Sequence, residues 1–395
     1  MRWLDKYIIY SSIFALFTEA FSFHYIIDWK LFYIIILINL IAIATRKRLT
    51  VNRNIIIFLL FLFIHGAVFY LWFQNPIKSL LAQLIGISIS SIYYYNFLIN
   101  YGTKLAFTKY LEVAFLIAII AIPMFYLNIN VFIYNRLNGI LTEPAHYAAI
   151  MLPATYVFLR NKNYLKFGIV LITIFLSKSS IGYVGLVFIL LLPLLKVKYL
   201  IKYSWLVILV IGISAYYIST QWNKPMNENE SNTLVRRLKQ TNESLTAVFT
   251  GEFEESTNLS TYAFISNTFI SREIFTDKPF GTGLGSYPYE YDKYYSLMKP
   301  PPYLIELKQS KINRTDANSL FLRMLVDLGI FAIIIFIYFA YRSIYIFKSD
   351  KKVIQQGSFF YLIIKLIREG HYFPPEFYFF LLIFLKEFDE NTTYS

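Results

Sequence analysis

Residues 54–73, NIIIFLLFLFIHGAVFYLWF, decide the fold class of this chain. As one helix these twenty residues, none of them Asp, Glu, Lys or Arg, would be about 30 Å long, which is the thickness of a bilayer's hydrocarbon core. Similar apolar runs recur along all 395 residues, 57% of which are hydrophobic. The runs do not alternate with period two, so they indicate helices rather than barrel strands. We therefore expect an all-α integral membrane protein.

We predict about twelve transmembrane helices, several of them short. The predicted spans are residues 7–26, 31–45, 54–73, 79–98, 108–127, 145–159, 167–177, 180–195, 203–218, 319–341, 357–367 and 375–385. The first apolar run follows MRWLDK directly and lacks a small-residue cleavage site, so we expect it to remain as an anchor rather than to be removed as a signal peptide.

The spans divide the chain into three parts. Residues 1–218 hold about nine helices, residues 219–318 form one loop of about 100 residues, and residues 319–395 hold about three helices and a tail. Loops this long are usually functional or disordered. The loop begins with the polar run WNKPMNENESN, after which Leu234, Leu238, Leu245 and Val248 form an apolar stripe at helical spacing. With a second predicted helix at residues 260–275, the loop is expected to be a folded cap containing short helices.

The net charge of +13 follows from membrane topology. With the N-terminus inside, the segments on the cytoplasmic side carry 19 Lys and Arg, whereas the short segments on the outer side carry 6. This asymmetry follows the positive-inside rule and predicts cytoplasmic termini and an outer loop. The loop itself holds 11 basic and 12 acidic residues. The positive charge therefore gives no reason to expect a nucleic-acid partner, and we expect none.

The composition also bears on metals and on transport. The chain has four histidines, no cysteine and no HExxH pattern, so we predict no metal site and no cofactor. We find no internal repeat, which disfavours transporters built from inverted repeats. We interpret Glu19, His24 and His65, in or beside predicted spans, as packing or interhelical hydrogen-bonding groups.

Residues 135–153, NRLNGILTEPAHYAAIMLP, place polar groups between two apolar runs. The Glu-Pro pair predicts a helix start, whose exposed amides attract anions such as phosphate. Arg136, Gly139, Glu143 and His146 lie at or before this start. Two interpretations stay open: a ligand site, or a helix cap at Glu143 with Arg136 extending to lipid headgroups.

Five segments occur in a fixed order along residues 136–385. They are RLNGILTEPAHYAAI, FLSKSSIGYVGLVFILLLPLL, SREIFTDKPFGTGLGSY, NSLFLRMLVDLGIFA and LIREGHYFPPEFYFFLLIFL. In this order they resemble the motifs of Wzy-type O-antigen and polysaccharide polymerases, in the O-antigen polymerase and ligase superfamily. Lys178 replaces an arginine of the family's second motif, and Asn318 stands where the ligase branch has a histidine. The resemblance therefore implies a polymerase rather than a lipopolysaccharide ligase.

The resemblance implies a metal-independent, polyprenyl-diphosphate-dependent glycosyltransferase. Such an enzyme transfers a glycan from undecaprenyl diphosphate to a hydroxyl of another lipid-linked repeat unit, inverting the anomeric centre. The expected location is the bacterial inner membrane, with the loop in the periplasm. The expected partners are the lipid-linked donor and acceptor, membrane lipid and a chain-length regulator protein. The alternatives are a ligase-like glycan transferase or, from a different class, a polysaccharide flippase or transporter, which would line a central path with buried charges.

The leaving diphosphate requires fixed cations near the membrane surface. The arginines that could supply them are Arg136, Arg272, Arg314 and Arg323. Arg323 lies inside a predicted span, where an unpaired charge costs at least about 2.5 kcal/mol. The alternative for Arg323 is a buried pair with Asp327, four residues further on.

The acceptor hydroxyl requires a general base, which must be a carboxylate or a histidine. The candidates are Glu143, His146, Glu273 and Asp316. Glu143 is the leading candidate because its motif matches. The helix N-terminus, however, would make this carboxylate a weaker base. A role in holding the sugar or in orienting Arg136 therefore explains Glu143 equally well. The other residues predicted to bind substrate are Gly139, Lys178 and Asn318. The Tyr-rich run SYPYEYDKYYSL is interpreted as a sugar-binding surface or as an aromatic belt.

Overall fold

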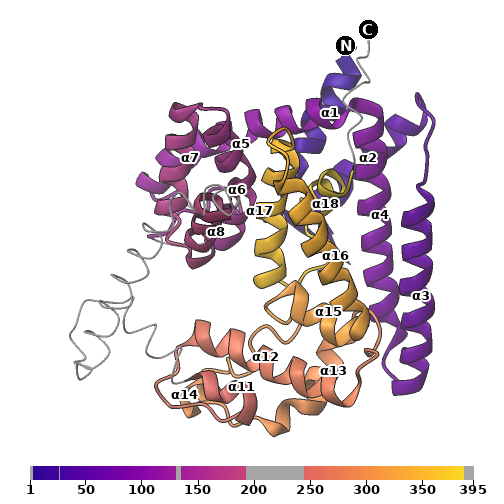
Figure 1. Ribbon diagram of the computed structural model, residues 1–395, viewed down its shortest axis with the longest axis vertical. Helices are drawn as coiled ribbons and strands as arrows, with labels where there is room; N and C mark the ends of the chain where they lie inside the picture. Colours follow the sequence, from indigo (N-terminus) through magenta and orange to yellow (C-terminus); the bar gives the residue numbers. More distant parts are fainter. Residues whose placement is uncertain (1–2, 26, 130–134, 193–243, 387–395) are drawn as a thin grey trace.

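The computed structural model describes residues 3–25, 27–129, 135–192 and 244–386 (Figure 1). Most of the described chain is helical. The helices are α1 Trp3–Ala15, α2 Leu31–Ala44, α3 Arg53–Phe73, α4 Ile77–Tyr101, α5 Thr103–Tyr126, α6 Pro144–Arg160, α7 Tyr164–Leu176, α8 Ser180–Leu191, α11 Ala247–Thr250, α12 Leu259–Asp277, α13 Tyr287–Tyr294, α14 Pro302–Glu306, α15 Leu320–Leu328, α16 Ile330–Phe347, α17 Val353–Ile367 and α18 Phe377–Leu385. Strands β1 Ser22–Tyr25 and β2 Ile27–Lys30 pair as an antiparallel hairpin.

Four described helices are long and apolar enough to cross a bilayer, namely α3, α4, α5 and α16. Helices α2, α7, α8 and α17 are shorter and also apolar. For the described residues, the prediction of a helical integral membrane protein is therefore confirmed. The number of crossings stays a prediction, and the predicted span at residues 203–218 lies outside the described residues.

The first predicted span, residues 7–26, is wrong in its second half. Helix α1 ends at Ala15, and tight turns follow in which Phe17 N donates to Phe14 O and Thr18 N to Ala15 O. The Thr18 hydroxyl also bonds Ala15 O at 2.8 Å, offering the backbone an alternative to another helical turn. The chain then enters the hairpin.

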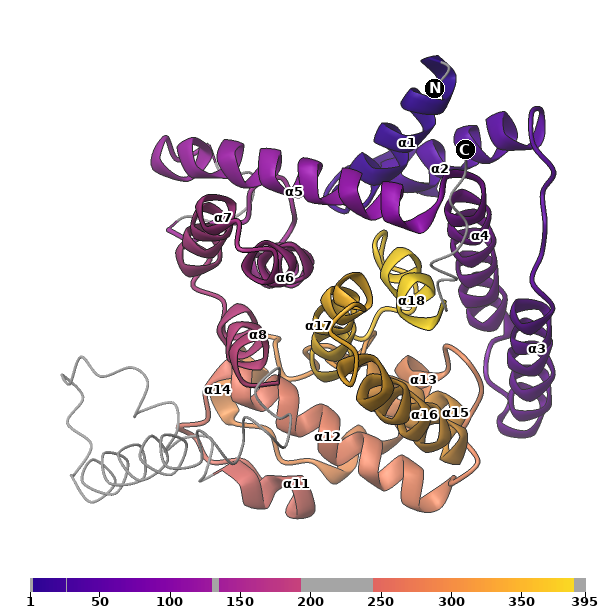
Figure 2. The same cartoon turned by 45° about the horizontal axis from the view of Figure 1, so that its top comes forward.

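Helix α6 pairs with α17 in the middle of the bundle, and the two run in opposite directions. Gly357 of α17 lets the helices approach, since a Cβ there would lie 3.4 Å from Pro153 O of α6. Tyr156 bonds Gln356, and Arg160 forms an ion pair with Asp350 at 2.9 Å. The start of α6 therefore lies beside the end of α17. Helices α12 and α13 pack on α15 near this end of the bundle (Figures 1 and 2), which we call the loop side.

The described part of the predicted loop, residues 244–318, is folded. Its small core contains Phe269, Tyr287, Tyr291 and, from α15, Val326. Helix α12 matches the helix predicted at residues 260–275. Tyr287 and Tyr291 are buried. For these two residues, neither the sugar-binding surface nor the aromatic belt considered above is correct. The polar run at residues 222–232, together with Leu234 and Leu238, lies outside the described residues.

A glycine loop, residues 279–285, docks this cap onto the bundle through its backbone. His65 and Tyr70 of α3 bond the carbonyls of Phe280 and Leu284 at 2.9 and 3.0 Å. Ser79 of α4 donates to Gly285 O at 2.7 Å. His65 was expected to be a packing or interhelical hydrogen-bonding group; its ring packs on Phe331 of α16, while its hydrogen bond goes to the loop rather than to a helix.

The carboxylate of Asp327 on α15 completes this docking. It accepts hydrogen bonds from the amides of Gly285 at 2.7 Å and Tyr287 at 3.1 Å. The hydroxyls of Ser286 and Tyr372 also donate to it, at 3.2 and 2.8 Å. Asp327 is fully buried, and these four donors replace the water that its charge has lost.

The predicted span at residues 319–341 is divided in two by Gly329. This glycine has φ +60 and separates α15 from α16. Ile330 N donates to Pro279 O at 2.8 Å, and a Cβ at Gly329 would lie 2.3 Å from Gly281 N. The glycine loop therefore occupies the space that a continuous helix would need. The break arises from a distant segment, which a local apolar pattern does not reveal.

Replacing Gly329 by Ala should destabilise the protein by about 3 kcal/mol, because the new Cβ meets backbone atoms and the positive φ is strained for alanine. The measurement is thermal unfolding of the detergent-solubilised protein. Gly168→Ala in α7 is the matched control, since nothing lies within 4 Å of a Cβ there and Ala favours the helix. Equal stability of the two variants would contradict the packing described for Gly329.

Candidate functional site

Charged and polar side chains gather at the loop side of the bundle, where α6 begins, α17 ends, α15 begins and the turn after α1 arrives. We call this set the charged site. Its members are Glu19, Glu143, His146, Asp316, Asn318, Arg323, Lys365, Arg368, Glu369, His371 and Glu376. Ionisable groups in membrane helices are costly and commonly mark functional positions.

His146 links the start of α6 to the turn after α1. The helix begins at Pro144, as its sequence predicts, which places His146 in the first turn. Its Nδ1 lies 2.6 Å from Glu19 Oε2, and its Nε2 lies 3.6 Å from Glu369 Oε2. Thr142 donates to the same Glu19 oxygen at 3.1 Å. Glu19 was expected to be a packing or interhelical group; it lies instead in the turn after α1, bonds His146 of α6 and belongs to the charged site.

Lys365, near the end of α17, is the most buried cation of the site, with a side chain 1% exposed. Its Nζ contacts Glu369 and lies 3.1 Å from Glu376 Oε1. Tyr361 donates to Glu376 at 2.8 Å. Burial raises the pKa of Glu376 and the ammonium of Lys365 opposes that rise. The buried charges therefore compensate one another in pairs.

Two backbone segments from either side of the cap lie directly against each other. Glu369 N donates to Asn318 O at 2.9 Å, and the Ser319 hydroxyl donates to Leu366 O at 2.7 Å. A Cβ on Gly370 would lie 1.4 Å from Asp316 O, so only glycine fits there. This contact holds the start of α15 against the turn after α17.

Asn318 and Arg323 are buried at this contact, each 4% exposed. Asn318 has φ +57, its backbone N–H donates to Asp316 at 3.2 Å, and its amide nitrogen Nδ2 has no hydrogen-bond partner among the described residues. Arg323 donates to Gly370 O at 2.8 Å, and its Nε lies 3.8 Å from Asp327. The alternative pairing of Arg323 with Asp327 is therefore observed.

Arg368 follows α17 and is only partly exposed. Burial lowers its pKa, while Glu143 and Asp316 act in the opposite direction. Among the described residues its guanidinium has no hydrogen bond or ion pair at contact distance. A partly buried cation in this state is suited to binding an anion.

Arg136 and Gly139 have other surroundings, whereas Glu143 belongs to the charged site. Arg136 donates to Ser177 O at 3.2 Å and to Lys178 O at 3.1 Å, and so holds the turn between α7 and α8. A Cβ on Gly139 would lie 3.3 Å from the ring of Tyr147, so the close approach at this glycine is to that ring. Glu143 is the N-cap residue of α6, but its side chain makes no capping hydrogen bond, so the capping interpretation is wrong.

Arg272 and Arg314 have partners within the cap. Arg272 bonds Glu273 at 2.6 Å and stacks on the ring of Phe249, whereas Arg314 forms an ion pair with Asp292. The expected gathering of arginines is therefore not seen in these contacts. Cations of α15 and of the α17 end, namely Arg323, Lys365 and Arg368, stand in the charged site.

Sequence reasoning missed the roles of several members of the site. They are Glu19, Lys365, Arg368, Glu369, His371 and Glu376. A signal was present, because REGHYFPPE, residues 368–376, sets three charged groups and a histidine between two apolar runs, and residues 136–146 likewise hold charged groups and a histidine.

Glu19, His146 and Glu369 are also the residues that could hold a metal ion, since one ligand atom from each lies within 4.8 Å of the others. The ammonium of Lys365, however, contacts Glu369, and His146 bonds Glu19 through Nδ1. A metal would have to displace a fixed cation of the protein. The donor set fits a charge-compensated network better than a metal site.

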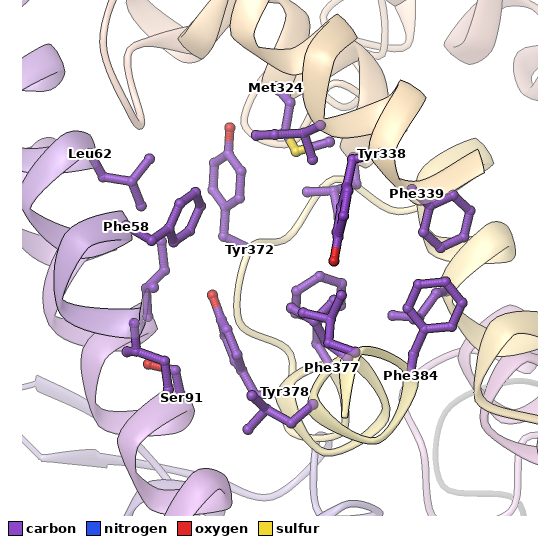
Figure 3. Close-up of a pocket in the computed structure, with 18 of the residues that line it drawn as sticks. Phe58, Leu62, Ser91, Met324, Tyr338, Phe339, Tyr372, Phe377, Tyr378 and Phe384 are labelled. Atoms are coloured by element: carbon purple, nitrogen blue, oxygen red, sulfur yellow. The ribbon is translucent and has the colours of Figure 1, made fainter. Parts of the chain in front are cut away.

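An apolar cavity of about 380 Å³ lies beside the charged site. Figure 3 shows Phe58 and Leu62 of α3 facing Met324, Tyr338 and Phe339 of α15 and α16 across it. Tyr372 and Leu366 line the same cavity, and both adjoin the contact between the start of α15 and the turn after α17. The cavity walls come from helices α3, α4 and α15–α18.

The fold and the charged site define an integral membrane protein with a buried ionic centre next to an apolar cavity. Residues 166–337, which include most of α7, all of α8, the cap and α15, match the family model of O-antigen ligase, Wzy_C. This match covers less than half of the chain and confirms its resemblance to the Wzy-type O-antigen polymerase and ligase superfamily over that part. No curated protein matches the chain.

Glu19→Gln should lower the free energy of unfolding at pH 7 by about 2 kcal/mol, because the variant loses a buried charge-assisted hydrogen bond to His146. Burial raises the pKa of Glu19, but His146 outweighs it and lowers the pKa to about 2. The stabilisation is therefore present above the unfolded pKa of about 4.3 and is lost as the pH falls through the folded value.

The measurement is thermal unfolding of wild type and variant from about pH 7 to about pH 3, over which the difference should shrink. Glu112→Gln is the control, since that carboxylate is exposed and pairs with Lys109 at the surface. A constant difference over the whole range would contradict the assignment of the charge to Glu19.

Proposed function

We propose that the protein is a polysaccharide polymerase of the O-antigen type. It transfers a glycan from undecaprenyl diphosphate to a sugar hydroxyl of another lipid-linked repeat unit, with inversion at the anomeric carbon. The reaction takes place on the outer side of the bacterial inner membrane, with both termini in the cytoplasm. The observation that carries this proposal is the match of residues 166–337 to the O-antigen ligase family, because these residues form the cap and the α15 border of the charged site.

The charged site supports this chemistry. Negative charge develops on the leaving diphosphate, and preorganised cations stabilise it most where water is excluded. Arg368 and Arg323 supply guanidinium groups at the loop side, next to the contact at Gly370. The apolar cavity beside them suits a substrate that carries a hydrocarbon chain.

Asn318 favours a polymerase over a ligase. The ligase branch that this chain resembles has a histidine at this position, and an amide side chain cannot act as a general base at neutral pH. A ligase-like transfer of glycan to a different acceptor is the second candidate, because the matching family model is that of O-antigen ligase.

Deleting the gene separates these functions. Loss of a polymerase should leave single repeat units on the final acceptor, whereas loss of a ligase or a flippase should leave none. Gel electrophoresis of the surface glycan gives the result. A deletion strain without any surface glycan would refute the polymerase.

Arg368→Ala should reduce polymer formation by about 100-fold, the usual cost of removing one donor to developing charge. Arg368→Lys should retain more activity, because it keeps the positive charge but loses the bidentate geometry. The measurement is polymer formed by the full-length chain at equal protein levels. Arg160→Ala is the control, since Arg160 pairs with Asp350 at the opposite end of the α6–α17 pair. Unchanged polymer in Arg368→Ala would remove this residue from the diphosphate site.

A further inference from the structure

His371 is placed by backbone contacts rather than by its own helix. It follows Gly370, whose lack of a Cβ allows the chain to pass directly over Asp316 O. The bond from Glu369 N to Asn318 O and that from Arg323 to Gly370 O fix the chain immediately before it. The imidazole is thereby held beside the start of α15, with Nε2 3.6 Å from Asp316 Oδ2.

Asp316 is itself fixed in position. Its Oδ1 accepts from Asn313 Nδ2 at 3.0 Å and from the backbone N–H of Asn318 at 3.2 Å. The other oxygen, Oδ2, faces His371. The 3.6 Å contact is longer than a hydrogen bond, so the carboxylate acts on the imidazole through its charge, which favours a proton on Nε2 and leaves Nδ1 as the proton acceptor.

His371 differs from His146 in access. Its side chain is 52% exposed, whereas that of His146 is 16% exposed and lies between Glu19 and Glu369. Burial lowers the pKa of His371, and the surrounding charges act in both directions: Glu369 and Asp316 raise it, and Arg323 and Lys30 lower it. A neutral imidazole open to solvent is competent to take up a proton and to release it again.

A buried hydrogen-bond donor lies next to the pair of His371 and Asp316. Asn318 Nδ2 is buried and lacks a hydrogen-bond partner among the described residues, although the backbone of the same residue bonds both Asp316 and Glu369. Buried donors of this kind are rare and call for a ligand or a water molecule as partner. The amide would serve to bind a sugar hydroxyl.

We propose that His371 is the general base of the glycan transfer and that Asp316 positions it. This inference rests on the proposed function. Nδ1 removes the proton from the acceptor hydroxyl as its oxygen forms the new bond to the anomeric carbon. The bond from that carbon to the diphosphate oxygen breaks, and its electron pair leaves with undecaprenyl diphosphate. The imidazolium then returns its proton to solvent, so no co-reactant is needed.

The test uses membranes containing the full-length chain, supplied with polyprenyl-diphosphate-linked repeat units. The rate of polymer formation is measured from about pH 5 to about pH 9. His371→Gln should lower the rate by about 100-fold or more and remove the acid limb of the profile. Asp316→Asn should keep part of the rate and move the acid limb to lower pH, because the carboxylate no longer stabilises the imidazolium.

Chemical rescue separates a base from a structural group. His371→Ala should regain activity when imidazole is added, since the position is half exposed. His371→Gln keeps a polar side chain of similar size, so it remains informative if the alanine variant does not fold. Lys308→Gln, at an exposed position of the cap, should behave as wild type.

The outcomes distinguish the two proposals. If wild type forms polymer and both His371 variants stay within about twofold of it, the base is another residue and the proposed function stands. If the His371 variants are inactive but imidazole does not rescue them and Asp316→Asn leaves the profile unchanged, His371 is structural. If wild type forms no polymer from these substrates, the proposed function itself fails.

Discussion

The contact between residues 316–319 and 366–370 is the constraint on which the rest of the structure depends. Two bonds and a glycine join the start of α15 to the end of α17, so the residues just before α15 determine where α17 ends. Because α17 pairs with α6, the same contact sets the position of Lys365 and Glu369 relative to His146. Buried charges retain their ionised forms only when partners lie this close.

This arrangement explains why polar groups from four separate segments gather within an apolar bundle. A single buried charge would be costly, but His146 and Lys365 each meet a carboxylate that lies outside their own helix. His146 meets Glu19, and Lys365 meets Glu369 and Glu376. The network therefore serves both the folding of the bundle and the chemistry proposed at its rim.

The sequence predicted local features well. The apolar runs predicted the long helices, the Glu-Pro pair predicted the start of α6, and residues 260–275 predicted α12. Features that depend on distant contacts were not predicted. The division at Gly329 comes from the glycine loop, and Glu19 and His371 reach the charged site only through the folding of remote segments. The roles assigned to Arg136 and Arg272 remain predictions. Arg136 bonds the turn between α7 and α8, and Arg272 bonds Glu273 within the cap.

The carboxylate of Asp327 has a consequence for how this protein comes apart. Four donors from the glycine loop, α13 and the turn after α17 converge on one side chain of a bundle helix, and Val326 beside it belongs to the core of the cap. Separating the cap from the helix bundle would leave the Asp327 carboxylate without its hydrogen-bond donors and would expose the core of the cap to water. The cap is thus no independent soluble module, and a fragment expressed without α15 would lack part of its own interior.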